Sequence, residues 1–130
     1  MITQSDWLQH AMTLATRSVD LLYADPPFNT GKAKTGTRGH GAKYLDSWPT
    51  TAAYISWLRE RLAATLPALR PTANILLHVD YRTSHHVRLL LDDLLGPDRF
   101  VNHLIWTYGL GGSSPRSFAR KHDDILFYCL

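Results

Sequence analysis

The sequence contains very little cysteine, and this scarcity already narrows the class of protein. Cys129 is the single cysteine among 130 residues, which excludes an internal disulfide framework and a cysteine-rich zinc site. The chain also lacks an apolar stretch long enough to span a bilayer. Its N-terminus lacks the basic region and apolar core of a secretory signal. These absences together predict a cytoplasmic protein.

A strong excess of charge is also missing. The 14 Lys and Arg against 11 Asp and Glu give a formal net charge of +3, too small to identify a nucleic-acid-binding protein. The distribution is more informative, because basic residues gather in two stretches: Lys32, Lys34, Arg38 and Lys43, and then Arg116, Arg120 and Lys121. The length and a hydrophobic fraction of 45% suit one domain with a modest core.

Residues 18–30 join an apolar run to a rigid polar corner. Val19–Ala24 is short and β-rich, which is typical of a buried strand in a parallel sheet. The pair Pro26-Pro27 cannot donate to a strand ladder and restricts φ, so the strand must end there. Asp25 and Phe28 are therefore held beyond the carboxyl end of a strand, where ligands bind in open α/β sheets.

This corner can bind an aromatic amine. The Asp25 carboxylate and the Pro26 carbonyl can together accept both hydrogens of an exocyclic amino group. Phe28 offers a face on which a flat base can stack. The corner therefore predicts a pocket for a nucleobase amino group. The alternative is an ordinary strand-ending turn, since Asp-Pro commonly opens turns.

The rest of the chain predicts alternating helices and strands. A strand end is expected to turn into a short helix after a Ser5 cap, with apolar spacing from Leu8 to Ala15. Pro67 and Pro71 are expected to end the first long helix. Apolar periodicity predicts helices over 51–66 and from a Ser84 cap to Leu95, and strands over 74–79, 101–106 and 125–130.

A stretch rich in glycine and basic residues, Gly31–Lys43, follows the corner. It is predicted to be a loop, which either engages phosphates or is a disordered surface segment. It is not a Walker loop, because no Gly-Lys-Ser/Thr follows.

Several motifs occur together in one order along nearly the whole chain. They are Asp25–Phe28, Tyr44-x-Asp46-x-Trp48, His78-Val79-Asp80, Leu91-Asp92-x-x-Leu95-Gly96, Asn102–Trp106 and His122-Asp123-x-Ile125-Leu126-x-Tyr128. This set resembles the first half of a β-class, permuted DNA amino-methyltransferase. Enzymes of that family use S-adenosylmethionine to methylate N6 of adenine or N4 of cytosine.

The resemblance implies an incomplete α/β fold. The family has a Rossmann-like sheet of order 3-2-1-4-5-7-6, of which this chain would supply strands 4, 5, 6 and 7 and a stub of 3. The donor-binding Phe-x-Gly-x-Gly segment is not found, so residues 1–130 are expected to form a partial catalytic domain that is inactive alone. The implied partners are double-stranded DNA, and a complementary C-terminal half or a second copy, but no membrane.

The resemblance also implies roles for individual residues. Adenine N6 is the expected target, and cytosine N4 methylation or a non-catalytic DNA-binding remnant are the alternatives. No metal is expected. The site residues are catalytic Asp25, Pro26, Pro27 and Phe28; substrate-binding Asn29, Thr30, Lys32, Lys34 and Arg38; and donor-binding Asp6, His78 and Asp80.

Other readings of the polar residues remain open. His78 and Asp80, with a second histidine, could imitate an iron site of two histidines and a carboxylate. Methylation at cytosine C5 is disfavoured, because Cys129 lacks a Pro-Cys context. Among the remaining residues, Trp57, Trp106 and Tyr128 are expected in the core, and His85, His86, Asp92 and Asp93 on the surface.

Overall fold

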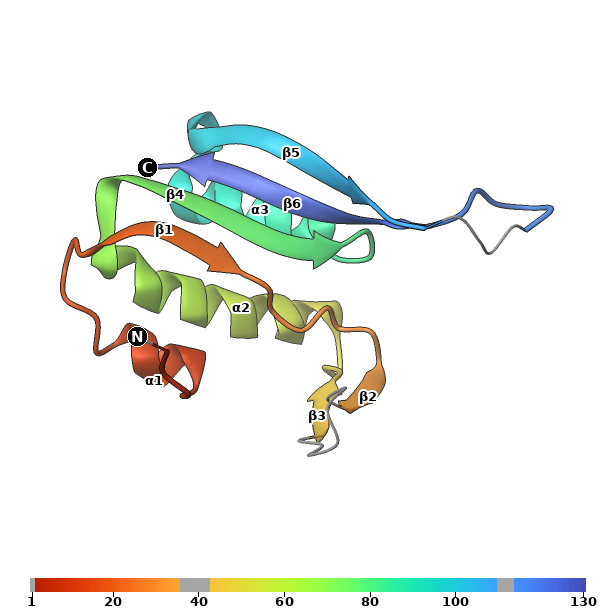
Figure 1. Ribbon diagram of the computed structural model, residues 1–130, viewed down its shortest axis with the longest axis horizontal. Helices are drawn as coiled ribbons and strands as arrows, with labels where there is room; N and C mark the ends of the chain where they lie inside the picture. Colours follow the sequence, from red (N-terminus) through yellow and green to blue (C-terminus); the bar gives the residue numbers. More distant parts are fainter. Residues whose placement is uncertain (1, 36–42, 110–113) are drawn as a thin grey trace.

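Four strands form an open sheet in the computed structural model, which describes residues 2–35, 43–109 and 114–130. Their order is β1 (Val19–Ala24), β4 (Leu69–Asp80), β6 (His122–Cys129) and β5 (Phe100–Thr107). The helices α2 (Thr51–Thr65) and α3 (Ser84–Leu95) lie on the same side of this sheet (Figure 1). The predicted α/β class is confirmed.

The strand order agrees with the sheet that the resemblance implied. β1 and β4 are parallel and α2 connects them, whereas β6 is antiparallel to both β4 and β5. The order of neighbouring strands across the sheet, β1-β4-β6-β5, corresponds to the 4-5-7-6 part of the expected sheet. Among the described strands β1 pairs only with β4, so its other edge has no partner there. The expected stub of strand 3 is wrong, because no strand occurs in residues 2–6.

The core lies between one face of the sheet and the two long helices. Ile75, Leu77 and Val79 alternate along β4 and are completely buried, as the two-residue period of a strand requires. Leu58 of α2 and Leu91 of α3 pack into the same cluster. Burying one such side chain contributes about 1.5–3 kcal/mol, so this face supplies most of the cohesion.

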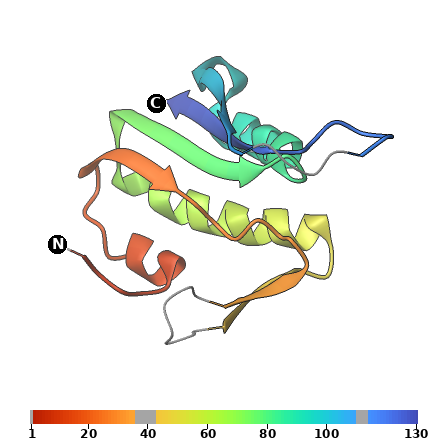
Figure 2. The same ribbon diagram turned by 45° about the vertical axis from the view of Figure 1, so that its right-hand side comes forward.

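The shorter elements lie around these layers (Figure 2). They are α1 (Trp7–Ala11), β2 (Lys32–Thr35), β3 (Lys43–Asp46) and the 3-10 turns η1 (Leu66–Ala68) and η2 (Pro97–Arg99). β2 and β3 pair as an antiparallel hairpin. The prediction of a loop over Gly31–Lys43 was therefore wrong at its two ends, while residues 36–42 lie outside the described part.

Helix termini differ from the sequence expectation at two places. Asp6, and not Ser5, caps α1, because its carboxylate accepts from the backbone N–H groups of Leu8 and Gln9 at 3.0 and 3.3 Å. The helix has only five residues although the apolar spacing continued to Ala15. Ser84 is the first residue of α3 and not its cap.

β4 begins five residues earlier than expected. Pro71 was predicted to stop the preceding helix, but it lies inside the strand. The pairing of β1 with β4 is irregular between Val19 and Leu21, and a proline is tolerated at such a place because ladder hydrogen bonds are already interrupted. Burial of Leu69 and Ala73 on either side of Pro71 favours the longer strand.

Tyr128 joins β6 to α3, and its burial confirms one prediction while correcting another. The side chain is completely buried, as expected. Its hydroxyl donates to the Asp92 carboxylate at 2.6 Å, and Arg88 pairs with the same carboxylate at 3.0 Å. Asp92 is therefore not a free surface carboxylate. Burial, together with this hydrogen bond, raises the pKa of Tyr128 well above 10.

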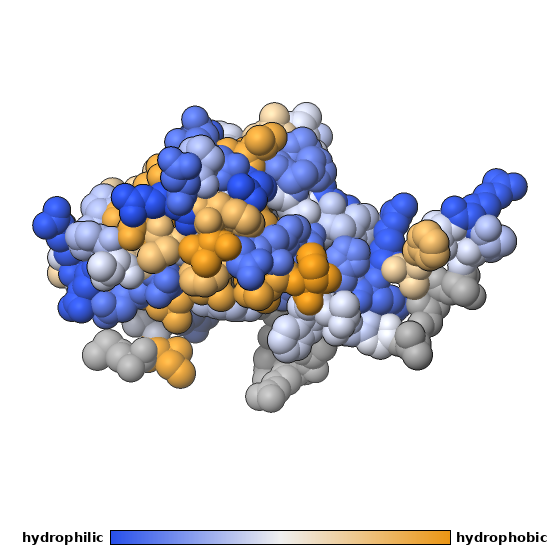
Figure 3. Space-filling model, turned by 90° about the horizontal axis from the view of Figure 1, so that it is seen from above, coloured by the Kyte–Doolittle hydropathy of each residue, from blue (hydrophilic) through white to orange (hydrophobic). Residues whose placement is uncertain are grey.

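The other face of the sheet exposes large apolar side chains, which lie among polar ones (Figure 3). Leu21, Tyr23 and Trp106 are 55%, 54% and 62% exposed. We refer to the side of the sheet opposite α2 and α3 as the open face. The expectation that Trp106 is a core residue was wrong, because in the described part of the chain no helix packs over this end of β5. None of the described helices is long and apolar enough to cross a membrane.

Candidate active site

The polar corner lies where the sequence placed it, directly beyond the carboxyl end of β1. β1 ends at Ala24, and Pro26 is buried while the Asp25 side chain is 59% exposed. A rigid backbone thus presents a carboxylate to solvent. This geometry can hold a ligand at the end of the sheet.

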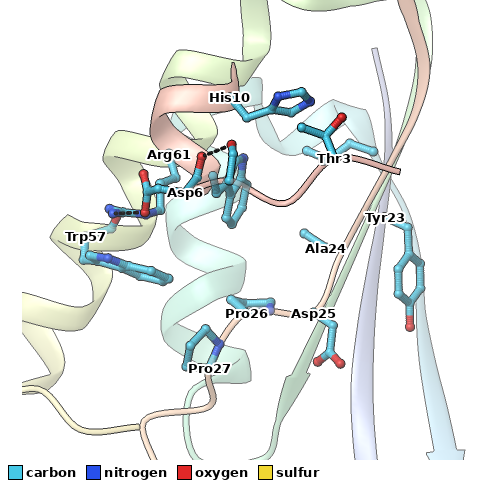
Figure 4. Close-up of a pocket in the computed structure, with 13 residues that line it drawn as sticks. Thr3, Asp6, His10, Tyr23, Ala24, Asp25, Pro26, Pro27, Trp57 and Arg61 are labelled. Carbon is cyan, nitrogen blue, oxygen red and sulfur yellow. Dashed lines mark hydrogen bonds and ion pairs between the residues drawn. The ribbon is translucent and has the colours of Figure 1, made fainter. Parts of the chain in front are cut away.

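A pocket of about 510 Å³ opens beside this corner (Figure 4). Its volume lies within the roughly 300–1,000 Å³ of small-molecule sites. The lining comes from the N-terminal segment, the second half of β1 with its corner, and α2: Thr3, Ser5, Asp6, Trp7, His10, Leu22, Tyr23, Ala24, Asp25, Pro26, Pro27, Trp57 and Arg61. The pocket therefore brings the predicted donor-binding Asp6 to the same cavity as Asp25.

Asp6 both caps α1 and forms part of the pocket wall. Besides capping α1, its carboxylate lies 3.6 Å from the Arg61 guanidinium. That guanidinium stacks over the Trp57 ring, 4.2 Å from the ring centre. Trp57 is partly buried in the core cluster, as predicted. One carboxylate, one guanidinium and one indole thus form the wall of the pocket opposite the corner.

The turn after the corner is held by a residue that the sequence analysis did not include in the site. Asp46 at the end of β3 is 1% exposed. Its carboxylate accepts from the Asn29 backbone N–H at 2.6 Å and from the Thr30 hydroxyl. Asn29 has φ 57°, a left-handed conformation that costs a non-glycine residue energy. The Tyr44-x-Asp46-x-Trp48 motif was the signal that could have identified this role.

The side chain of Asn29 also makes a hydrogen bond, in which it is the acceptor. Its side-chain oxygen accepts from the Trp48 backbone N–H at 3.0 Å. Trp48 packs edge-on against Tyr54 at 4.9 Å between ring centres. Burial, with the nearby carboxylates of Asp46 and Asp80, raises the pKa of Tyr54 well above 10. The turn is thus tied to the aromatic part of the core.

His78 lies next to the corner on the open face. Its Nδ1 is 3.4 Å from the Asp25 carboxylate, and its Nε2 is 3.3 Å from that of Asp123. The Phe28 ring meets the imidazole edge-on, with 5.2 Å between centres. His78 therefore contacts the corner directly, although it does not line the pocket.

Asp80 makes different contacts. It is buried, and it accepts from the Arg82 backbone N–H at 3.0 Å and from Nε of the same residue at 2.6 Å. The hydrogen bond to Asp80 raises the pKa of Arg82. Like His78, Asp80 does not line the pocket. The structure therefore brings His78 to the corner and Asp6 to the opposite wall of the pocket beside it, but it engages Asp80 in an ion pair with Arg82.

The predicted DNA-contacting residues fall into two groups. Asn29 and Thr30 use their polar groups within the turn. Lys32 is exposed at the start of β2. Lys34 belongs to the same strand, and Arg38 lies outside the described residues. Lys32 is thus the one member of the basic group whose exposed side chain the structure describes.

The structure also places the histidines that were expected on the surface or considered for a metal site. His85 and His86 are exposed, as expected. Among the described residues, no group of three or more His, Cys, Asp or Glu side chains is arranged to hold a metal ion. The reading of His78 and Asp80 as an iron site gains no support, because the two residues bind separate partners.

Known relatives are DNA methyltransferases. The chain is 26% identical to the type II methyltransferase M.KpnI of Klebsiella pneumoniae, over 94% of this chain and 30% of that protein. It is 28% identical to M.EcaI of Enterobacter cloacae, over 94% of this chain and 28% of the relative. The chain thus spans about a third of the length of these relatives.

Solved structures share the fold. PvuII DNA methyltransferase, cytosine-N4-specific, superposes with a TM-score of 0.65 at 14% identity, covering 96% of this chain and 47% of the other. M1.HpyAVI in its SAM complex superposes with a TM-score of 0.56 at 15% identity, covering 98% and 52%. The family model for N6/N4 DNA methylases matches residues 19–129. The chain therefore belongs to the N6/N4 DNA methylase family.

Proposed function

We propose that this chain supplies the catalytic corner of a DNA methyltransferase that transfers a methyl group from S-adenosylmethionine to a base amino group. The observation that carries the proposal is the exposed Asp25 carboxylate, which lines a pocket at the carboxyl end of β1. The matched family and the methyltransferase relatives support the same reaction. The target base must leave the duplex stack, because its amino group is inaccessible within it.

The corner activates the amino group by geometry. The lone pair of such a nitrogen is delocalised into the ring, so the nitrogen is a poor nucleophile. The Asp25 carboxylate and the Pro26 carbonyl each accept one N–H, which favours a tetrahedral nitrogen with a localised lone pair. The same acceptors stabilise the positive charge that develops at this nitrogen, and the product then loses a proton. Phe28 stacks on the extruded base.

The donor site fits the pocket only in part. S-adenosylmethionine supplies an electrophilic methyl sulfonium when it is bound. Asp6, together with Trp57 and Arg61, forms the wall that would hold it beside Asp25. His78 and Asp80, which were also expected to contact the donor, do not line this pocket, so they would contact only a part of the donor that extends past the Asp25 corner. The Phe-x-Gly-x-Gly segment that completes such a site in the family would come from a complementary half.

The target atom and the DNA contact are the finer parts of the proposal. Adenine N6 is the first target to test and cytosine N4 the alternative, because both present two N–H groups to the same acceptors. Lys32, with Lys34 and Arg38, would neutralise phosphates of duplex DNA. Asn29 and Thr30 would form the rim of the base site.

The test is methyl transfer from labelled S-adenosylmethionine to duplex DNA by this chain combined with a complementary donor-binding half. We expect Asp25→Ala to lower the transfer rate by at least about 100-fold while DNA retention and thermal unfolding stay unchanged. Mass spectrometry of the digested DNA then identifies N6-methyladenine or N4-methylcytosine. Near-normal transfer by Asp25→Ala would refute the proposal.

A further inference from the structure

A chain of polar side chains crosses the open face at the end that carries the corner. Ala24 of β1 is in register with Leu77 of β4, so the next residues, Asp25 and His78, come side by side. β6 lies on the other side of β4 and contributes Asp123. Three strands that are far apart in sequence thus place one polar residue each in a row.

The imidazole of His78 is constrained on both nitrogens. Nδ1 faces Asp25 and Nε2 faces Asp123, at 3.4 and 3.3 Å. Carboxylates only accept hydrogen bonds, so a ring nitrogen that carries a proton can donate it to the carboxylate it faces. The ring is mostly buried, with 19% of its side chain exposed. Burial and the carboxylates on both sides therefore restrict the rotation of the ring away from Asp25.

Asp123 is itself held in place. The Tyr108 hydroxyl donates to its Oδ1 at 3.3 Å, while Oδ2 is the oxygen that faces His78. The row therefore ends at Tyr108, an exposed residue that directly follows β5. In many active sites a histidine that contacts a functional group is itself oriented by a carboxylate. Here Asp123 would orient His78, and His78 contacts Asp25, the group that would act on the base.

The corner needs such an orienter. Asp25 follows the end of β1, and more than half of its side chain is exposed, so few contacts restrict its χ angles. The contact with His78 occupies Oδ1 and leaves Oδ2 to accept from the base. The edge of the same imidazole supports the Phe28 ring. One side chain therefore bears on both groups that would meet the base.

We propose that His78, held by Asp123, is a positioning residue that fixes the Asp25 carboxylate and the Phe28 ring for the amino group. This inference rests on the proposed function. The sequence predicted that His78 contacts the methyl donor. The inference gives it a second role, toward the Asp25 carboxylate that binds the amino group. A misplacement of about 1 Å at a reacting group can cost a rate factor of roughly 100.

The experiment compares variants at position 78 in methyl transfer with the complementary half present. We expect His78→Ala to lower kcat by roughly 10- to 100-fold with the KM for DNA changed less than about threefold. His78→Asn keeps an N–H donor near the place of Nδ1, so it should recover about tenfold of the loss. His78→Gln presents its donor toward Asp123 and should recover less. Asp123→Asn should fall between His78→Ala and the unmodified chain.

Two controls keep the outcomes distinct. His85→Ala changes an exposed histidine of α3 outside this row and should leave kcat unchanged. If His78→Ala does not fold, the order of His78→Asn above His78→Gln still tests the inference. If every position 78 variant has the kcat of the unmodified chain while Asp25→Ala abolishes transfer, the positioning role is overturned and the proposed function is not. Unchanged transfer by Asp25→Ala overturns the proposed function instead.

Discussion

The two faces of the sheet use apolar residues in opposite ways, and β4 shows the contrast within one strand. Leu77 is completely buried beneath the helices, whereas the adjacent Leu76 points to the open face and stays partly exposed. On the neighbouring strand β1, Ala24 is buried and Tyr23 is exposed. The covered face holds the fold together, while the open face carries large apolar side chains that no described element covers.

The polar residues of the row that contains Asp25 lie on the open face and at its edge, and not on the covered face. His78 and Asp123 lie on the open face, and Asp25 follows the strand at its unpaired edge. Exposed apolar patches and unpaired strand edges invite association with another chain segment. The candidate site therefore lies beside exposed apolar side chains and the unpaired edge of β1 in the described part of the chain, and not where that part is best packed.

The sharpest test of the contrast uses the two adjacent leucines of β4. Leu77→Ala should lower the free energy of unfolding by about 2–5 kcal/mol, because it leaves a cavity under α2 and α3. Leu76→Ala should cost about 1 kcal/mol or less, because its site is already open to solvent. Urea denaturation of the two variants measures both values. Equal losses would mean that the faces do not differ in their contribution to stability.

A smaller effect is expected at the turn, which polar contacts hold and not packing. Asp46→Ala removes the acceptor of the Asn29 N–H and the Thr30 hydroxyl. Hydrogen bonds to a charged group contribute about 1.5–3 kcal/mol each. Because the substitution also removes a buried charge whose desolvation costs energy, stability should fall by a net of about 1.5–3 kcal/mol, and methyl transfer should fall with it. Thermal unfolding and the transfer assay measure the two effects.

Asp20→Ala is the matched control for this change. Asp20 is a carboxylate of β1 that pairs with Arg70 at 2.9 Å in an exposed position. An exposed pair contributes about 0–1 kcal/mol, so the substitution should have little effect on either measurement. A loss for Asp46→Ala that is no larger than for Asp20→Ala would show that the turn does not depend on Asp46.

Much of the fold could be predicted from local pattern. The apolar runs of β1 and β6 and the end of α3 at Leu95 were visible because each depends on nearby residues. The start of β4 was missed because Pro71 is normally a terminator, and only its pairing irregularity with β1 explains its place in the strand. Trp106 was assigned to the core from its apolar neighbours, but what covers a strand face is decided by distant elements.

In the site, too, the features set by nearby residues could be predicted, and those set by distant elements could not. The corner from Asp25 to Phe28 could be predicted because its backbone restrictions are local. The contacts of Asp25 with His78, and of His78 with Asp123, depend on strand order and register, which a pattern along the chain does not contain. Asp46 was visible as part of a motif, but its two acceptor contacts with the turn required the hairpin of β2 and β3.

The most direct test of the account measures donor binding by calorimetry, with this chain alone and together with a complementary half that carries the Phe-x-Gly-x-Gly segment. The pocket beside Asp25 is lined in part by β1, whose other edge has no partner among the described strands, and under the proposed function a complementary half would supply the rest of the donor site. We predict no measurable heat of S-adenosylmethionine binding by the chain alone, and both binding and methyl transfer once the half is added. Tight donor binding and methyl transfer by the purified chain alone would contradict the account.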